Sequence, residues 1–282
     1  MPPSASSSVQ QARRVLADRL AEIRRDAGLS GRDLAAATGW YASKVSRIEH
    51  ARTAPSADDI RAWCSACSAD DQAPALVASL RAVEGMFVEW RRMERAGLRH
   101  AQVAVRPLFE RTTRFRAYSS WFIPGLIQGR TYTEAVLRAV QRRRVEVDDV
   151  AAAVDARMER QQLLHQPGKT WAFLLEESVL RSGIGGAEVM VGQLGHLITV
   201  SALPSVSVGV IPAGPDRTRM PVEGFWVFDS AQVNVELVSG YLTITQPPEV
   251  AQYVEAYAEL ARHAVYGTEA RALIVKAIDA VR

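Results

Sequence analysis

The sequence predicts an all-helical N-terminal domain joined to a C-terminal α+β domain. Two observations support this division. Up to about residue 97, apolar residues recur at helical spacing in short segments that are separated by capping residues and glycine. Beyond that point, β-rich segments and helical segments follow one another irregularly, which is typical of an α+β fold rather than of repeated βαβ units. With 282 residues, 48% of them apolar and 23% charged, the chain is long enough to bury two cores.

The N-terminal domain is expected over residues 11–73, after a disordered arm over residues 1–10. Apolar residues at spacings near 3.6 predict four short helices. Two of these helices are predicted to begin at capping boxes, in which a hydroxyl is followed three residues later by a carboxylate. The first two helices are expected to end at glycines, because glycine adopts the left-handed backbone of a helix end with the least strain. The capping boxes are Ser30 with Asp33 and Ser56 with Asp59, the glycines are Gly28 and Gly39, and the third helix runs from about Tyr41 to His50.

A longer helix is expected to link the domains over residues 74–98. Pro74 marks its start. Five apolar residues then follow at alternating spacings of four and three, which is a short heptad-like seam. The seam could either dimerise or pack on the C-terminal domain. Its residues are Leu76, Leu80, Val83, Phe87 and Trp90.

The C-terminal α+β domain is expected over residues 99–282. Runs of β-branched and aromatic residues predict six strands, and Ser239-Gly240 is a plausible hairpin turn between the last two. The predicted strands are Arg114–Phe122, Trp171–Leu175, Val206–Ile211, Phe225–Phe228, Val233–Val238 and Tyr241–Thr245. The predicted helices are Thr131–Val140, capped by Thr131 and Glu134, then Asp148–Leu164, Ala187–Ala202, Pro248–Tyr266 and Thr268–Val281.

Composition narrows the possible functions. No run of about 18 apolar residues is present, so we expect no membrane span. The N-terminus lacks the basic start and apolar core of a secretory signal, and two cysteines are too few for a disulfide-rich fold, so we expect a cytoplasmic protein. Basic residues outnumber acidic ones by ten to seven over residues 11–68 and by nine to four over 81–116. This basic front indicates a polyanionic partner.

The N-terminal motif resembles a known family of DNA readers. Leu29 to Gly39, followed by Val45-Ser46-Arg47-Ile48-Glu49, resembles the phage-repressor-like (XRE) helix-turn-helix. The whole chain resembles the WhiJ-like, Streptomyces-type regulators of actinobacteria, which join such a reader to a C-terminal domain of unknown function. Segments that look like that domain are Phe87–Arg91, Tyr118–Gln128 and Gln193–Leu197.

The resemblance implies which residues meet DNA, because in such readers the third helix lies in the major groove. Ala42, Ser43 and Arg47 are then the candidates for contact with base edges, and Arg47 could donate two hydrogen bonds to a guanine. The family often has Gln where this chain has Gly31, Ala42 and Ser43, so we expect readout to rely more on Arg47, on the aromatic pair Trp40-Tyr41 and on DNA shape. The full set expected near DNA is Arg32, Trp40, Tyr41, Ala42, Ser43, Lys44, Ser46, Arg47, His50 and Arg52, with Arg32, Lys44, His50 and Arg52 at phosphates.

Neighbouring residues are expected to serve the scaffold. Leu34, Ala35, Val45 and Ile48 are predicted core residues, and Glu49 is predicted to pair with an arginine of the chain. Cys64-Ser65-Ala66-Cys67 is a lone C-x-x-C within a predicted helix. A structural zinc site needs four ligands, so we interpret both cysteines as buried packing residues. We expect no metal and no cofactor.

A weaker hypothesis places a ligand in the C-terminal domain near Glu176, Arg181 and His196. A glycine-rich segment, Ser182–Gly186, precedes a helix there and could hold an anion, although a simple turn explains it better. His196 lies in an apolar helix, where a core histidine is the simpler interpretation. No sequence pattern of a hydrolase or of a nucleotide-binding loop is present, so we do not expect an enzyme.

Two functions remain open. The first is a homodimeric transcriptional regulator, expected to be a repressor in developmental or secondary-metabolism control, that binds a double-stranded DNA operator at the nucleoid. Its C-terminal domain would dimerise and bind a small-molecule effector or a small partner protein. The alternative is an antitoxin-like module that neutralises a small protein encoded nearby and regulates its own operon.

Overall fold

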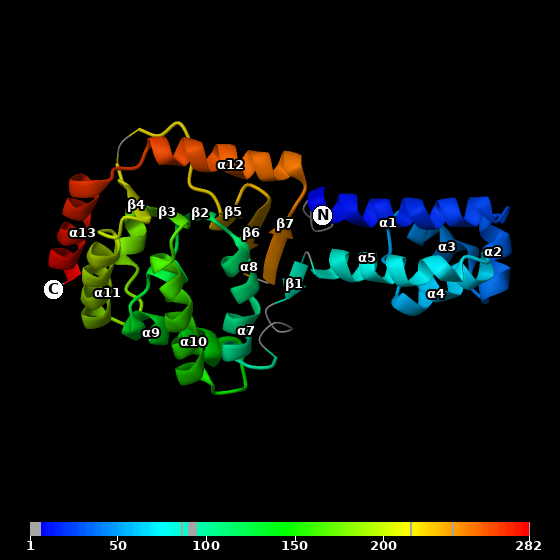
Figure 1. Ribbon diagram of the computed structural model, residues 1–282, viewed down its shortest axis with the longest axis horizontal. Coiled ribbons are helices and arrows are strands. Elements are labelled where there is room, and N and C mark those ends of the chain that lie inside the picture. Colours follow the sequence, from blue (N-terminus) through cyan, green and yellow to red (C-terminus); the bar gives the residue numbers. More distant parts are fainter. Residues whose placement is uncertain (1–6, 86, 90–94, 215, 239, 282) are drawn as a thin grey trace. The chain divides into compact units, whose positions relative to one another are not determined.

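The computed structural model describes residues 7–85, 87–89, 95–214, 216–238 and 240–281. It divides into two compact units, unit 1 over Met1–Phe87 and unit 2 over Val88–Arg282 (Figure 1). The boundary falls within the segment that was expected to link the domains. Among the described residues, no helix combines the length and the apolar character that crossing a bilayer requires.

Unit 1 is a bundle of helices around one apolar core. Leu20, Leu34, Ile48, Ile60 and Trp63 are each at most 1% exposed at its centre. Both predicted capping boxes are present, with the hydroxyl and the carboxylate each accepting a backbone amide. The helices are α1 (Ser7–Asp26), α2 (Gly31–Thr38), α3 (Ala42–Glu49), α4 (Ala57–Ala66) and α5 (Ala73–Gly85), with a 3-10 turn at Asp70–Gln72.

Two expectations about the ends of unit 1 were wrong. Helix α1 begins at Ser7, so residues 7–10 are helical rather than part of a disordered arm. The helix expected over 74–98 ends at Gly85, and the short strand β1 follows at Phe87–Glu89. Leu76 and Leu80 of the expected seam are buried in the core of unit 1, which they help to close. Trp90, the last seam residue, lies outside the described residues.

Unit 2 contains a mixed sheet in the order β1-β7-β6-β5-β2-β3-β4 (Figure 1). Strands β2, β3 and β4 are parallel, whereas β5 pairs antiparallel with β2 and continues through β6 and β7 as an antiparallel meander. The strands are β2 (Arg114–Ser119), β3 (Thr170–Glu176), β4 (Val206–Ile211), β5 (Phe225–Phe228), β6 (Gln232–Glu236) and β7 (Gly240–Ile244). The six predicted strands are therefore confirmed, with shifted ends at four of them; residue 239 of the predicted hairpin turn lies outside the described residues.

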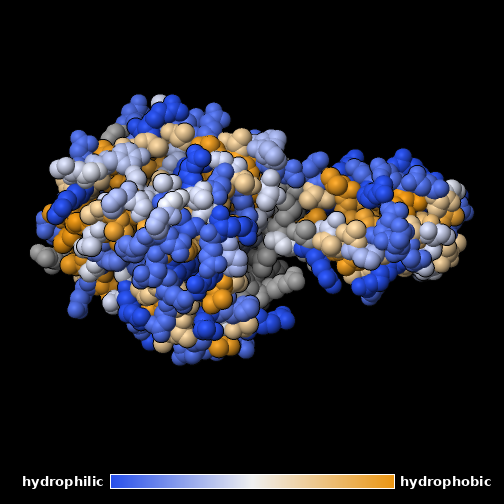
Figure 2. Space-filling model, in the orientation of Figure 1, coloured by the Kyte–Doolittle hydropathy of each residue, from blue (hydrophilic) through white to orange (hydrophobic). Residues whose placement is uncertain are grey.

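Helices cover both faces of this sheet. On one face, α9, α11 and α13 enclose an aromatic core that includes stacked Phe115 and Trp171, with ring centroids 3.7 Å apart. On the other face, α12 packs over Tyr118, Leu174 and Phe225. Polar residues occupy most of the visible surface, with apolar patches between them (Figure 2). The helices are α7 (Leu98–Ala104), α8 (Arg106–Arg111), α9 (Arg130–Arg144), α10 (Val150–Gln161), α11 (Ala187–Val200), α12 (Pro247–Arg262) and α13 (Gly267–Val281).

Local chemistry explains where the sequence prediction missed helices. The expected cap of α9 at Thr131 is wrong, since the helix begins at Arg130 after Gly129 and no side chain caps it. Helices α7 and α8 were not predicted. The amides of Leu98 and Arg99 at the start of α7 instead donate to the Asp149 carboxylate, each over 2.9 Å. Such a cap comes from a residue 50 positions away, so local patterns cannot show it.

Candidate nucleic-acid interface

A tight turn between α2 and α3 sets the angle of α3. Gly39 adopts a left-handed conformation with φ 71°, and the amide of Trp40 donates to the Ala35 carbonyl over 2.8 Å. These bonds satisfy carbonyls at the end of α2 and turn the chain directly into the next helix. Tyr41 is the N-cap residue of α3 and contributes no side-chain capping bond. The arrangement is a helix-turn-helix.

One side of α3 is anchored in the core and the other side is free. Val45 and Ile48 are each 1% exposed and pack among α1, α2 and α4. The exposed residues of α3 recur at intervals of one, three and four, so they form one continuous stripe along the helix. The members of this stripe, which we call the α3 face, are Ala42, Ser43, Ser46, Arg47 and His50, and all five are exposed.

Two residues expected near DNA form contacts with other side chains of unit 1. The Lys44 ammonium lies 2.5 Å from an Asp59 carboxylate oxygen and 4.0 Å from the centroid of the Trp40 ring. Trp40 is half-buried and packs against Trp63, with ring centroids 6.3 Å apart. Although partial burial acts to raise the pKa of Asp59, hydrogen bonds from Lys44 and from the Ser56 amide hold it below its ordinary value. We therefore assign Lys44 and Trp40 to the scaffold of α3 rather than to a free phosphate-facing surface.

The C-terminal end of α3 is fixed by a second ion pair. Arg24 of α1 donates to both carboxylate oxygens of Glu49, over 2.6 Å and 3.2 Å, and also to the Leu29 carbonyl over 2.6 Å. Both side chains of the pair are only 15% exposed. The prediction that Glu49 pairs with an arginine of the chain is confirmed. The pair ties α1, the turn before α2 and α3 into one rigid frame.

Exposed cationic and aromatic groups flank the α3 face. Arg32 and Arg52 are exposed, and Tyr41 is 85% exposed. A shallow groove lined by Ser30, Arg32 and Ser46, among others, separates the start of α2 from α3. Because the Asp33 carboxylate already caps α2, the start of that helix is less favourable for a phosphate, whereas the start of α3 carries no such carboxylate cap.

The C-x-x-C cysteines and the three residues of the weaker ligand hypothesis have other surroundings. Cys64 and Cys67 are buried in the core of unit 1, where burial raises the pKa of both thiols. No group of three or more His, Cys, Asp or Glu side chains that could hold a metal occurs within the described parts of the chain.

The structure does not unite Glu176, Arg181 and His196. Glu176 is buried at the end of β3, where it pairs with Arg217 over 2.7 Å and accepts the Tyr118 hydroxyl over 2.8 Å. Arg181 is an exposed partner of Glu177. Burial lowers the pKa of His196 on α11, and its Nε2 atom is buried without a hydrogen bond. Because each has separate neighbours, the hypothesis of a shared ligand site at these residues is withdrawn.

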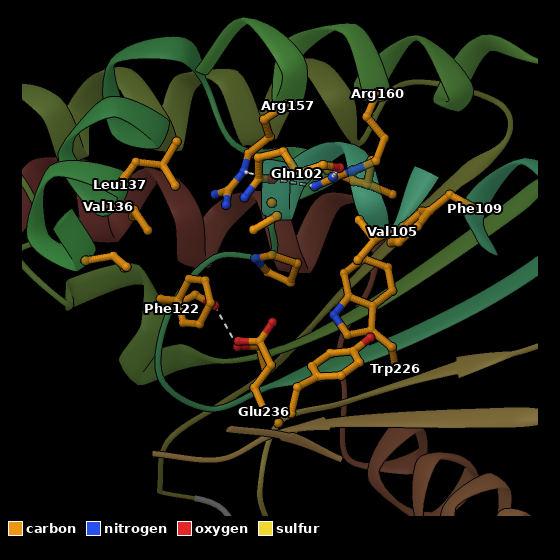
Figure 3. A pocket seen from close by; sticks show the side chains of 18 of the residues that line it. Gln102, Val105, Phe109, Phe122, Val136, Leu137, Arg157, Arg160, Trp226 and Glu236 are labelled. Atoms are coloured by element: carbon orange, nitrogen blue, oxygen red, sulfur yellow. Dashed lines mark hydrogen bonds between the residues drawn. The ribbon is translucent and has the colours of Figure 1, made fainter. Parts of the chain in front are cut away.

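Unit 2 instead contains a cavity, partly open to solvent, that sequence reasoning missed. It has a volume of about 200 Å³ and lies between β5, β6 and β7 of the sheet and helices α7 to α10 (Figure 3). Gln102, Arg157, Arg160, Trp226 and Glu236 contribute to its lining. A signal was present in the sequence: Arg157 and Arg160 occupy positions on the same face of α10 as buried Ala153, where a core helix ordinarily has apolar residues.

The fold and the α3 face define unit 1 as a helix-turn-helix domain, the class of module that reads DNA. Comparison with known families agrees, because residues 15–77 match a family described as a helix-turn-helix domain. Residues 108–276 match the family described as a domain of unknown function, DUF5753, and the chain belongs to that family.

Comparison with other proteins adds two distant likenesses. A phospholipase D family member, Nuc from Salmonella typhimurium, aligns over 59% of this chain and 90% of its own, with 11% identity and a TM-score of 0.32. TrmBL2, an archaeal chromatin protein whose structure shows a novel mode of DNA binding, aligns over 74% of this chain and 69% of its own, with 11% identity and a TM-score of 0.30. The curated proteins gave no match.

Proposed function

We propose that this chain is a sequence-specific DNA-binding transcriptional regulator of the XRE type, in which α3 enters the major groove. The observation that carries the proposal is the α3 face, a continuous exposed stripe on a helix whose opposite side is locked into the core. A helix presented in this way, behind a tight turn from the preceding helix, is the geometry by which helix-turn-helix proteins reach base edges.

Within this proposal, the side chains of the α3 face divide the work. Arg47 is exposed and donates two N–H groups to one guanine. Ser43 and Ser46, whose side chains are shorter, form hydrogen bonds to nearby bases. Arg32, Arg52 and Tyr41 contact the DNA backbone on either side. Lys44 and Trp40 hold α3 in place from behind.

The test is selection of operator sites from random DNA, followed by binding measurements on the selected site. Arg47→Ala is expected to relax specificity at one base position and to weaken the selected site by about 1–3 kcal/mol, or about 5- to 150-fold. Arg52→Ala is expected to weaken all sequences alike and to lower the slope of log affinity against log salt by about one.

A matched control separates these effects from a general loss of positive charge. Arg19 of α1 is an exposed arginine whose guanidinium lies 2.9 Å from both Glu22 and Gln72, and it does not belong to the α3 face. Arg19→Ala should leave site selection and the salt slope unchanged. Selection of the same sequences by the Arg47→Ala protein, at undiminished affinity, would count against α3 as the reading helix.

We further propose that the regulator acts as a homodimer on two half-sites about one DNA turn apart, on chromosomal DNA in the cytoplasm. Its resemblance to WhiJ-like regulators supports repression of developmental or secondary-metabolism genes. Sedimentation with single and paired half-sites tests the stoichiometry. A single protein bound per full operator would remove the dimer from the proposal.

Unit 2 serves as the sensing domain in this proposal. Its concave cavity, lined mostly by apolar side chains with a few charged ones, favours a small molecule as the regulating ligand over the small partner protein of the antitoxin-like alternative. Co-expression with the neighbouring small reading frame distinguishes the two, because the alternative requires a stable complex and a growth defect when that frame is expressed alone.

A further inference from the structure

We propose that the cavity of unit 2 binds a small aromatic carboxylic acid, with its carboxylate at Arg157 and Arg160 and its ring among the aromatic side chains. Both arginines project from α10 toward the same end of the cavity (Figure 3). The proposal deepens the sensing role given to unit 2 and rests on that role for its regulatory meaning. Binding itself depends only on the side chains around the cavity.

The first argument is incompletely compensated positive charge. Arg160 is 8% exposed, and Arg157 lies beside it. Their hydrogen-bond acceptors are neutral amide oxygens of Gln102 and Gln128, and among the described residues no carboxylate lies within 4.0 Å of either guanidinium. Burial lowers the pKa of Arg157 to about 10 and that of Arg160 to about 9. Glu236 across the cavity offsets this charge only in part, because it forms no ion pair with the half-buried Arg157 or the buried Arg160 among the described residues, so a bound anion would lower the remaining cost of burial.

The second argument is that donor atoms remain for a ligand. The side-chain oxygens of Gln102 and Gln128 accept hydrogen bonds from Nε and Nη1 of Arg157, respectively. Among the described residues, its Nη2 atom donates no hydrogen bond. The backbone carbonyl and the side-chain oxygen of Gln102 accept hydrogen bonds from Nη1 and Nη2 of Arg160. Arg160 Nε is buried without a partner. These unused N–H groups are available to a carboxylate, whose two oxygens match the planar fork of a guanidinium.

The third argument is the shape and polarity of the remaining lining. Phe109, Phe122 and Trp226 surround the space with aromatic surface, which favours a flat ring (Figure 3). The Glu236 carboxylate lies across the cavity from the two guanidinium groups and favours their charged form, so the positive charge that would receive the acid lies at the arginine end of the cavity. About 200 Å³ is below the roughly 300–1,000 Å³ of pockets for drug-sized ligands, so the acid is small.

Calorimetry on the full chain tests the proposal with a panel of acids and their neutral amides. The pairs are indole-3-acetate with indole-3-acetamide, salicylate with salicylamide, and 4-hydroxyphenylacetate with its amide. We expect at least one acid to bind with one site per chain and at least about tenfold more tightly than its amide. Arg157→Gln should abolish that preference. Arg138→Gln, which removes an exposed arginine paired with Glu134 on α9, should keep it.

A second variant covers the case in which Arg157→Gln fails to fold. Val136→Phe adds a ring to the cavity wall without removing a polar group, and it should weaken the acid at least about tenfold. The proposal is overturned if no acid binds, if acid and amide bind equally, or if Val136→Phe binds the acid like the parent. Operator binding is measured separately with and without the acid, so a failure of DNA recognition leaves the calorimetric result standing and distinguishable.

Discussion

The ion pair between Arg24 and Glu49 is the feature of unit 1 whose removal should be most informative. Arg24→Met leaves a carboxylate that is 15% exposed and the Leu29 carbonyl without their donor. Breaking a fully buried pair costs about 3–5 kcal/mol, and partial exposure with relaxation of Glu49 toward solvent reduces this to about 2–4 kcal/mol. The double variant Arg24→Met with Glu49→Leu replaces the pair by apolar packing, and it should lie within about 1 kcal/mol of the parent.

Native-state hydrogen exchange on the full chain measures this loss locally. Amides in the core of unit 1 should exchange about 30- to 700-fold faster in Arg24→Met, and amides of unit 2 should be unchanged and serve as an internal reference. Arg19→Met, which removes an exposed pair with Glu22, should cost less than about 1 kcal/mol. The reasoning is refuted if Arg24→Met costs less than about 1 kcal/mol, or if the double variant is as unstable as the single one.

Two further predictions concern pH. Burial acts to raise the pKa of Asp229, but hydrogen bonds from the Thr113 and Arg114 amides hold it below 3.8. The stability contributed by the ionised carboxylate is therefore complete above about pH 4 and disappears as the pH falls through the lowered pKa. Asp229→Asn should flatten this loss of stability at acid pH in urea titrations of unit 2. Burial lowers the pKa of His196 below 6.5, so the stability of the fold falls as the pH decreases from 6.5 through the lowered pKa. His196→Gln should remove this slope in thermal melts. Parallel curves of melting temperature against pH for the parent and the variant would contradict the prediction.

Local patterns in the sequence were sufficient for most elements of the fold. Serine and carboxylate at a fixed spacing predicted the starts of α2 and α4, and Gly39 predicted the turn into α3, because these signals act within one helical turn. Runs of β-branched and aromatic residues placed the strands. The β1 strand and the cap of α7 by Asp149 were missed, since both depend on partners far along the chain.

The candidate site was predictable in outline but not in its contacts. Helical spacing is enough to put Ser43, Arg47 and His50 on one exposed face. Whether Lys44 is free depends on Asp59, a residue of another helix, and spacing within α3 carries no information about it. The cavity of unit 2 was harder still, because its walls come from helices and strands between residues 98 and 241 that meet only in the folded sheet.

The mixed sheet has a consequence for how the chain emerges from the ribosome. Unit 1 is built from nearby contacts and can fold while synthesis continues. Strand β2 must wait about 56 residues for β3 and about 111 residues for β5, its two neighbours. At ~5–20 residues per second, the edge of β2 that pairs with β5 stays without its partner for roughly 6–22 s. Nascent chains stalled before residue 225 should therefore recruit holdase chaperones through this strand, long after the first domain is finished.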